Sequence, residues 1–299
     1  MQTVLITGGT GLIGKTLTNA LLQKGYHVIV LSRKSQPSSG NVTYAQWDID
    51  KKTIDVTAVQ KADYIIHLAG AGVVDKKWTT AYKKEIQDSR TKSSELLIDT
   101  LKNNTHKIKA VISASAIGWY IPSDILHTED EKADDSFLGE TCRLWEESVE
   151  PFKQLNIRVA KLRIGIVLSK DGGALAEFIK PIKFGVAAIL GSGKQLISWI
   201  HIDDLCRLFI YGIENQNINS IYNAVASEPV TNKTLTLSLA KKLKGRFFIP
   251  MHVPEFVLKI MLGGRSVEIL KSSRVSNEKI LKEGFVFSFD TIDKAIENL

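Results

Sequence analysis

The sequence predicts a doubly wound α/β fold, in which a parallel sheet is covered by helices on both faces. Two observations lead to this prediction. Short apolar runs alternate with amphipathic helical segments through the first half of the chain, and most of the runs are continuous rather than alternating in polarity. Continuous apolar runs are typical of strands buried on both faces. Strand–helix alternation favours parallel strands joined by crossover helices.

Six strands are expected, each a short run rich in β-branched residues. They cover residues 4–7, 27–32, 44–48, 64–68, 110–115 and 158–167. Between them, apolar positions recur at helical spacing. The first helix contains Leu12, Leu17 and Leu21 and is expected to stop at Gly25, a plausible C-terminal cap. A longer helix spans 82–101, and a third spans 137–149.

The second half of the chain is organised differently. Alternation fades after about residue 168, where glycines punctuate a loop-rich stretch, and a helix begins near Asp203. The tail from 229 to 299 is expected to be mostly helical, with breaks at Pro250 and Pro254. We therefore expect a doubly wound domain at 1–168, with further core elements around 198–226, interleaved with a smaller, mainly helical lobe at 169–299. The cleft between the two is the default ligand site.

Composition excludes several classes of protein. Hydrophobic residues make up 44% of the 299 residues and charged residues 24%, which is typical of globular proteins. No apolar run approaches the roughly 18 residues of a membrane span, and the first residues resemble a strand rather than a secretory signal. The net charge of +7 is spread over scattered basic pairs with acidic residues nearby, so no nucleic-acid surface is expected. The two cysteines have no metal-ligand spacing. We expect a cytoplasmic protein with no membrane, nucleic-acid or metal partner.

A glycine-rich turn follows the first strand and leads directly into the first helix. Gly8, Gly11 and Gly14 have the spacing G-x-x-G-x-x-G. In a dinucleotide-binding turn the glycines allow the tight turn, the approach of the backbone to a pyrophosphate, and close packing of helix on strand. The helix N-terminus then offers free amides to the phosphates. Strand, turn and helix together predict a Rossmann fold that binds a dinucleotide through this turn, including Thr10, Leu12 and Ile13. A glycine-rich turn without a ligand is the alternative.

The end of the second strand indicates which dinucleotide is bound. An NAD site usually has an acidic residue here for the ribose 2′-hydroxyl, but this chain has Ser32 and Arg33. A guanidinium matches a 2′-phosphate, so NADP(H) is expected over NAD(H). Alternatively, Arg33 is a solvated residue at a strand end. Asp48, which ends the third strand, is placed to contact the adenine or, alternatively, to cap a helix.

These motifs resemble the short-chain dehydrogenase/reductase superfamily, in its extended, epimerase-like branch. The resemblance covers essentially the whole chain and includes residues 7–14, 67–71, 113–115 and 201–205. Residues 115–120, 142–146, 198–201 and 284–287 are similar to an atypical subgroup often labelled "epimerase family protein", whose members bind NADP(H) and mostly lack a known substrate. The resemblance implies cofactor contacts at the ends of the fourth and fifth strands, from Leu68, Ala69, Gly70, Ala71 and Ser113.

The superfamily's usual proton-transfer pair is missing. Standard members use Tyr-x-x-x-Lys on the helix after the fifth strand, where the tyrosine is the general acid or base and the lysine lowers its pKa. One register places Leu138 and Cys142 at these positions, and the other places Phe137 and Thr141 there. Neither register supplies a phenol or an ammonium group.

Two hydroxyl groups remain as candidate catalytic residues. Ser115 stands where the superfamily's catalytic serine would sit, and Tyr120 lies on the loop just beyond the fifth strand. The alternatives are that Ser115 satisfies local backbone groups and that Tyr120 closes a pocket or packs. His67 and His201 are expected to be structural, and the pair Asp203–Asp204 is expected to cap a helix.

Arg90 and Arg163 are expected to contact the cofactor. Each lies within an apolar segment, where an unpaired buried charge is costly and an anionic partner is needed. A cofactor phosphate, a substrate carboxylate or a structural aspartate would serve. Gly165 lies in the stretch that, by the same resemblance, lines the nicotinamide pocket.

Two functions are consistent with these features. One is an NADP(H)-dependent oxidoreductase or epimerase acting on a small carbonyl or alcohol substrate. The other is a non-catalytic NADP(H)-binding sensor or partner-binding protein, which the absent Tyr/Lys pair favours. The resemblance also makes a homodimer possible, whereas the identity of the substrate is not readable from the sequence.

Overall fold

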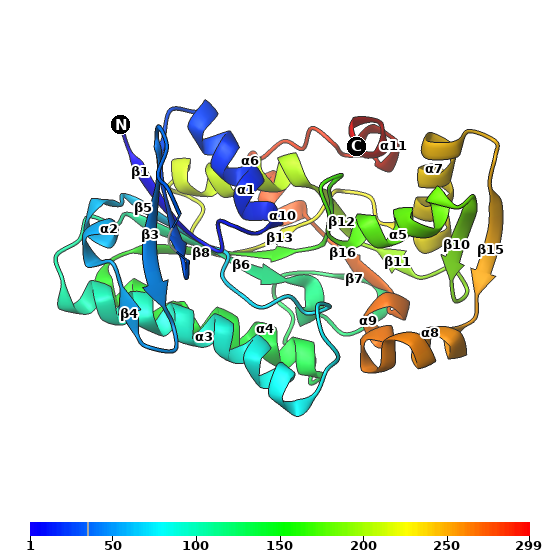
Figure 1. The fold of residues 1–299 in the computed structure, drawn as a ribbon, viewed down its shortest axis with the longest axis horizontal. Helices are drawn as coiled ribbons and strands as arrows, with labels where there is room; N and C mark the ends of the chain where they lie inside the picture. Colours follow the sequence, from blue (N-terminus) through cyan, green and yellow to red (C-terminus); the bar gives the residue numbers. More distant parts are fainter. Residues whose placement is uncertain (35) are drawn as a thin grey trace.

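The computed structural model describes residues 1–34 and 36–299 and is built around an eight-stranded sheet (Figure 1). The strand order is β13-β8-β6-β5-β1-β2-β3-β4. Neighbouring strands are parallel except for β3 and β4, which are antiparallel. The strands are β1 (Thr3–Thr7), β2 (His27–Ser32), β3 (Val42–Asp48), β4 (Thr53–Ile54), β5 (Tyr64–His67), β6 (Ala110–Ala116), β8 (Arg158–Ile164) and β13 (Ile221–Ala224).

This order confirms the predicted doubly wound fold. The chain runs outward from β1 through β2 and β3, then crosses back to β5 on the other side of β1. The order therefore reverses between β1 and β5. In open α/β sheets, ligands bind outside the carboxyl ends of the strands at such a switch point.

Helices cover both faces of the sheet (Figure 1). On one face α1 (Leu12–Gln23) packs against α6 (Ile202–Glu214). On the other lie α2 (Val56–Lys61), α3 (Thr80–Asn103) and α4 (Phe137–Ser148), and α3 packs along α4. The first helix ends as predicted, because Gly25 follows the C-cap residue with φ of +83°.

The predicted cap of the helix near Asp203 was wrong. His201 is the N-cap residue of α6, and its Nδ1 accepts a hydrogen bond from the backbone N–H of Asp203 at 3.2 Å. Asp203 and Asp204 lie in the first turn instead, where negative charge is favourable at the positive end of the helix dipole.

The predicted strand at 158–167 is divided into β8 and β9 (Ile166–Leu168). Gly165 lies at the break, and a Cβ atom there would stand 2.7 Å from the carbonyl oxygen of Ser198. Beyond it β9 leaves the main sheet and pairs with β12 (Trp199–His201). The apolar pattern continues across both strands, so periodicity alone could not show the break.

Most of the remaining elements follow residue 168 and form the part of the molecule on the right in Figure 1. Several of them pack around an apolar cluster that includes Trp199, Leu235 and Ile296. The helical tail is interrupted at both prolines, as expected: Pro250 lies within a strand, and Pro254 is the N-cap of α8. The elements are β7 (Ser123–His127), α5 (Ala174–Lys183), β10 (Val186–Leu190), β11 (Leu196–Ile197), β14 (Val230–Thr231), α7 (Asn232–Lys244), β15 (Ile249–Val253), α8 (Glu255–Leu262), α9 (Ser266–Leu270), β16 (Ser273–Val275), α10 (Glu278–Lys282) and α11 (Ile292–Asn298), with 3-10 turns at Ile117–Trp119, Glu150–Leu155 and Gly263–Arg265.

Within residues 1–34 and 36–299, no helix is both long and apolar enough to cross a bilayer.

Candidate functional site

The glycine-rich turn has the geometry of a phosphate-binding turn. Gly8 has φ of +69°, and a Cβ atom there would lie 2.8 Å from the backbone of Leu68. A Cβ atom on Gly14 would lie 2.4 Å from the Cα of Gly9, so this glycine is required for α1 to pack against the turn. At Gly11, by contrast, a Cβ atom would meet only the Gly8 carbonyl oxygen, at 3.3 Å. The turn is therefore tightly packed on the protein side and open at Gly11.

The N-terminus of α1 is free to bind an anion. Gly11 is the N-cap residue and has no side chain to accept hydrogen bonds from the amides of the first turn, and that turn contains no acidic residue. Unsatisfied amides and the helix dipole together favour a phosphate at this position. Thr10 and Gly11 are exposed and Leu12 and Ile13 half-buried, as a contact with a ligand requires.

A cavity of about 430 Å³ adjoins the same turn and includes residues that sequence reasoning missed. Its lining is Leu12, Lys15, Thr16 and residues 171–173. Lys15 is exposed on α1, and its ammonium group forms no ion pair within the described part of the chain. Its position directly after Gly14 was a usable signal. The contribution of residues 171–173 could not be predicted, because tertiary folding brings this segment back over α1.

The end of β2 presents an unpaired cation. Ser32 is buried, and its hydroxyl accepts the backbone N–H of Lys34 at 3.2 Å. Arg33 is exposed, and its guanidinium has no hydrogen bond or ion pair to any described residue. Asp48 serves the turn between β3 and β4, where its Oδ1 accepts the amides of Asp50 and Lys51 at 3.0 Å. The helix-capping alternative was therefore wrong, because the side chain holds a turn between two strands. Its contact with the adenine stays a prediction.

The loop after β5 lies against the glycine-rich turn. The amides of Leu68 and Ala69 both donate to Thr7 Oγ1 at 3.1 Å, and the amide of Ala71 donates to Ser89 Oγ at 2.9 Å. The structure therefore brings together the two segments from which cofactor contacts are expected.

His67 is structural, as predicted. Its ring lies between Thr7 Oγ1, at 2.8 Å from Nδ1, and Ser94 Oγ, at 3.1 Å from Nε2. It is completely buried, and burial lowers its pKa to about 4. The neutral ring thus links β1 and β5 to α3.

A buried polar network occupies the ends of β6 and β8. Arg163 Nε and Nη2 donate to the two carboxylate oxygens of Glu146 at 2.8 and 3.1 Å, and Arg163 Nη1 donates to the Tyr120 hydroxyl at 3.0 Å. The Ser115 hydroxyl donates to Glu146 Oε1 at 2.8 Å. The Tyr120 hydroxyl donates to Asn223 Oδ1 at 2.7 Å. Each of these side chains is at least 96% buried.

This network bears on three predicted site residues. The anionic partner of Arg163 is Glu146, so its charge is neutralised within the protein. The hydroxyls of Ser115 and Tyr120 are both engaged, and burial raises the pKa of Tyr120 to about 12. Tyr120 thus packs as its alternative interpretation expected. Sequence reasoning missed Glu146 and Asn223, although a glutamate on the apolar face of α4 was a signal.

The other positions near this network are also enclosed. Ser113 is buried, with its hydroxyl donating to the carbonyl of Ala114 at 3.0 Å. Gly165 is buried against the backbone of Ser198 and the side chain of Val225. Packing alone accounts for this glycine, and cofactor contacts at Ser113 and Gly165 stay predictions.

Arg90 differs from Arg163. It is 8% exposed, its Nη1 donates to the carbonyls of Ile86 and Ala71 at 2.8 and 3.1 Å, and its guanidinium stacks 4.7 Å from the centre of the Trp145 ring. No carboxylate among the described residues pairs with it.

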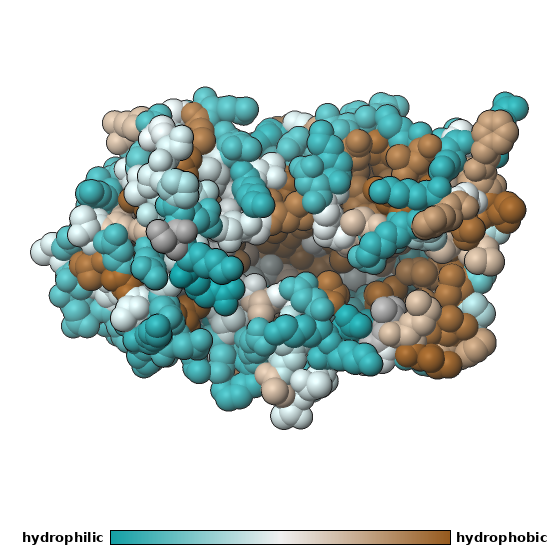
Figure 2. Space-filling model, in the orientation of Figure 1, coloured by the Kyte–Doolittle hydropathy of each residue, from teal (hydrophilic) through white to brown (hydrophobic). Residues whose placement is uncertain are grey.

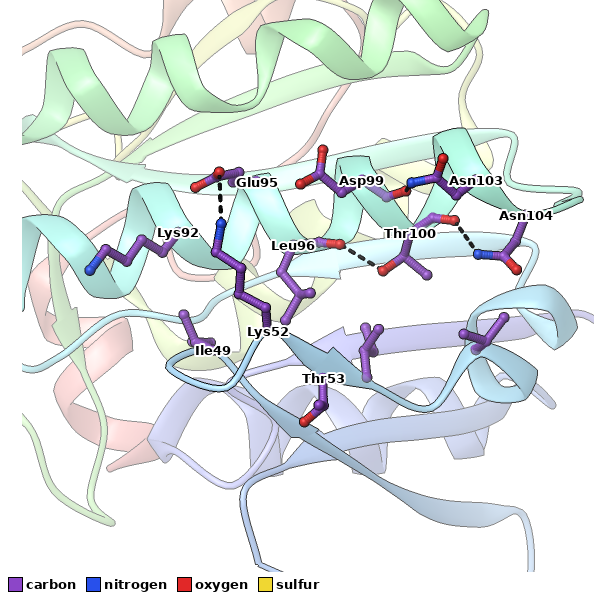
Figure 3. Close-up of a pocket in the computed structure, with 12 residues that line it drawn as sticks. Ile49, Lys52, Thr53, Lys92, Glu95, Leu96, Asp99, Thr100, Asn103 and Asn104 are labelled. Carbon is purple, nitrogen blue, oxygen red and sulfur yellow. Dashed lines mark hydrogen bonds and ion pairs between the residues drawn. The ribbon is translucent and has the colours of Figure 1, made fainter.

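The surface is hollowed near the middle of the face shown in Figure 2, between the sheet and the C-terminal half, and apolar side chains line the hollow. A second cavity, of about 370 Å³, lies elsewhere, between the β3–β4 turn and the outer surface of α3 (Figure 3). Several of its polar groups bond to one another or to α3, as Lys52 does with Glu95 at 3.5 Å. None of the predicted site residues lines this second cavity.

Comparisons with known proteins agree with this geometry. Residues 4–224 match the NAD dependent epimerase/dehydratase family, and residues 253–299 match a domain of unknown function, DUF1731. An epimerase family protein of Staphylococcus haemolyticus is 34% identical over 100% of this chain and 99% of its own length. An epimerase family protein of Staphylococcus aureus strain MRSA252 is 33% identical over the same shares.

Solved structures show the same fold. Human epimerase family protein SDR39U1, crystallised with NADPH, superposes with a TM-score of 0.87 at 27% identity, covering 99% of this chain and 98% of that one. UDP-N-acetylglucosamine 4-epimerase from Bacillus cereus superposes with a TM-score of 0.77 at 16% identity, covering 100% and 98%. From the family match and the full-length relatives, we conclude that the chain belongs to the NAD dependent epimerase/dehydratase family.

Proposed function

We propose that the protein binds NADP(H) across the carboxyl ends of β1, β2 and β5 and acts as an oxidoreductase or epimerase on a small carbonyl or alcohol substrate. The uncapped N-terminus of α1 behind the open Gly11 is the observation on which the proposal rests. The doubly wound part, 1–168 with elements around 198–226, would hold the cofactor. The lobe at 169–299 would cover the substrate.

Different residues of this chain would bind different phosphate groups of the cofactor. The first-turn amides of α1, with Thr10, Leu12 and Ile13, would bind the pyrophosphate, and Lys15 would add a positive charge. Arg33, beside Ser32, would bind the 2′-phosphate, because its guanidinium is exposed and unpaired within the described part of the chain. The NADPH in the human relative supports this assignment. The bound cofactor supplies hydride transfer, and the protein supplies position and electrostatics.

Proton exchange at the substrate oxygen needs a group other than the usual tyrosine. The hydroxyl groups of Tyr120 and Ser115 donate hydrogen bonds to Asn223 and Glu146, respectively, and both side chains are almost fully buried. Either could act only after the network opens. We therefore assign the exchange to water in the cleft, and keep Ser115 and Tyr120 as the positions to test.

A thermal-shift series with NADPH, NADP+, NADH and NAD+ tests cofactor binding. At 100 times its Kd, a ligand stabilises the folded state by about 2.7 kcal/mol, which corresponds to about 4 °C for a chain of this length. We expect this shift from NADPH and NADP+ alone. Arg33→Gln should reduce it to the level of NADH, whereas the matched control Lys34→Gln, beside it and also exposed, should not.

Gly11→Ala separates binding from folding. Its new Cβ atom would contact little of the protein but would stand where the pyrophosphate approaches. The variant should keep the melting temperature of the ligand-free protein and lose the shift with every nucleotide. If the wild type shifts with none of the four nucleotides, the proposal is wrong.

Turnover is tested separately, by following NADPH oxidation with a broad panel of carbonyl compounds. Oxidation with any of them supports the enzymatic proposal. Tight NADPH binding without oxidation across the panel would refute the oxidoreductase. An epimerase recycles its cofactor and is tested by NMR for inversion of added hydroxyl compounds in the presence of NADP+. Failure of both assays would leave a non-catalytic NADP(H)-binding protein.

A further inference from the structure

Arg90 presents an unused hydrogen-bonding edge beside the loop that follows β5. Its Nη1 is held by the carbonyls of Ile86 and Ala71, and its plane is fixed against the Trp145 ring. A Cβ atom on Gly70, which is exposed, would lie 2.9 Å from Arg90 Cζ. The guanidinium therefore lies directly beneath the loop from which cofactor contacts are expected, while Nε and Nη2 have no acceptor among the described residues.

Another arginine of the chain, Arg163, shows how the Nε–Nη2 edge of a guanidinium binds a carboxylate. Arg163 uses Nε and Nη2 to hold both carboxylate oxygens of Glu146, at 2.8 and 3.1 Å. This two-pronged pairing of a guanidinium with a carboxylate is specific in geometry as well as strong. Arg90 offers the same pair of donors with no carboxylate opposite them. A guanidinium that is 92% buried favours an anionic partner, because a buried charge without one is costly.

A second buried polar group beside Arg90 also lacks a hydrogen-bond partner among the described residues. The Trp145 indole N–H, on the ring stacked against Arg90, is buried and has no acceptor within the described structure. Cys142 stands at one of the two positions where the usual lysine would be expected. Burial raises the pKa of its thiol to about 12, and the charge of Arg90 acts in the opposite direction.

The phosphates of the proposed cofactor already have partners. The pyrophosphate is assigned to the N-terminus of α1, and the 2′-phosphate to Arg33 at the end of β2. Arg90 comes instead from α3, beneath the loop after β5 and against α4, on the opposite side of β1 from β2. The anion left for Arg90 is therefore one that belongs to the substrate.

We infer that Arg90 binds a carboxylate group of the substrate through its Nε–Nη2 edge, so that the substrate is a carbonyl or hydroxyl compound that also bears a carboxylate. This inference rests on the proposed function and narrows its substrate class. In this role Arg90 binds and positions the substrate and takes no part in proton transfer.

The test compares carboxylic acids with neutral counterparts on the full-length protein. Pyruvate, 2-oxoglutarate and benzoylformate are each titrated against the corresponding methyl ester, with the protein saturated with NADP+ so that no hydride is available. Binding is followed by ligand-observed NMR. We expect at least one acid to bind at least about tenfold more tightly than its ester, because charge-assisted hydrogen bonds are lost in the ester.

Two variants and one control identify the receptor. Arg90→Gln removes the charge, whereas Arg90→Lys keeps the charge but loses the paired Nε and Nη2 donors. The lysine variant still tests the inference if the glutamine variant folds poorly. Both should lose the preference for the acid by about tenfold and keep the wild-type affinity for NADP+ within about twofold. Arg158→Gln is the matched control, because Arg158 donates only to the carbonyls of Gly212, Ile213 and Ile218. It should keep the preference.

The outcomes that overturn the inference are distinct. They are that no acid binds more tightly than its ester, or that the Arg90 variants keep the preference. Loss of NADP+ affinity by tenfold or more in both variants would show that the anion is a cofactor phosphate. If the wild type binds no NADP+, the proposed function fails, and the same titration on the nucleotide-free protein still decides whether Arg90 binds a carboxylate.

Discussion

Replacing Glu146 by glutamine tests the buried network most directly. The substitution keeps the shape of the side chain and removes its charge. Glu146 is 4% exposed and accepts three hydrogen bonds, two from Arg163 and one from Ser115. Arg163 is 1% exposed, and its other acceptors among the described residues are the Tyr120 hydroxyl and the Glu129 carbonyl, both uncharged. The variant therefore leaves a buried guanidinium without a counter-ion.

The expected loss follows from this burial. Removing one partner of a buried ion pair lowers the free energy of unfolding by about 3–5 kcal/mol. For a chain of 299 residues, the unfolding entropy is about 0.6 kcal/mol/K, so the melting temperature should fall by about 5–8 °C. Differential scanning fluorimetry gives the melting temperature, and urea titration gives the free energy of unfolding.

The control is Glu278→Gln, which breaks the exposed pair with Lys282, whose side chains are 70% and 72% exposed. Solvent screens an exposed i,i+4 pair, so this variant should melt within about 1 °C of the wild type. The double variant Glu146→Leu with Arg163→Met should recover most of the stability, because an apolar pair needs no counter-ion. If Glu146→Gln shifts the melting temperature no more than the control does, the reasoning is refuted.

Three further predictions concern stability. Gly14→Ala should lower the free energy of unfolding by at least about 1–3 kcal/mol in urea titration, because its Cβ atom would stand 2.4 Å from the Cα of Gly9. The pKa of His67 is about 4 in the folded protein and about 6.5 in the unfolded chain, so the unfolded state takes up the proton first as the pH falls. The protein should therefore lose stability between about pH 6.5 and pH 4, by about 3 kcal/mol in full. Asp204→Asn should lower the melting temperature by several degrees, because the carboxylate is fully buried and accepts the amides of Ser288 and Phe289 at 3.0 and 2.8 Å.

Each of these has a clear contrary result. A Gly14→Ala protein as stable as Gly11→Ala would show that the turn is not tightly packed. For His67, urea titrations at pH 7 and pH 5 should differ more in the wild type than in His67→Gln, and equal differences would refute the assignment. For Asp204, an unchanged melting temperature would show that the tail at 285–289 is not held by this carboxylate.

The sequence alone determined the features that depend on local chemistry. Apolar periodicity placed six of the eight strands of the sheet, all but β4 and β13, and the three main helices of the first half, because burial on two faces imposes a continuous pattern. The glycine spacing located the tight turn between β1 and α1, since only glycine is tolerated at Gly8 and Gly14. The missing Tyr/Lys pair was likewise visible, because both positions lie on one helix. The domain boundary at 168 stays a prediction.

Only the tertiary structure decided how the charged and polar groups are paired. Glu146 and Arg163 are 17 residues apart, and Tyr120 and Asn223 are 103 apart, so no local pattern connects them. Arg90 and Arg163 look alike in the sequence, yet folding gives a carboxylate to one and, among the described residues, only backbone carbonyls to the other. The reason is physical. The spacing of apolar residues along a short segment shows which of them are buried, whereas the partner of a buried charge is the distant side chain that the fold brings within hydrogen-bonding distance.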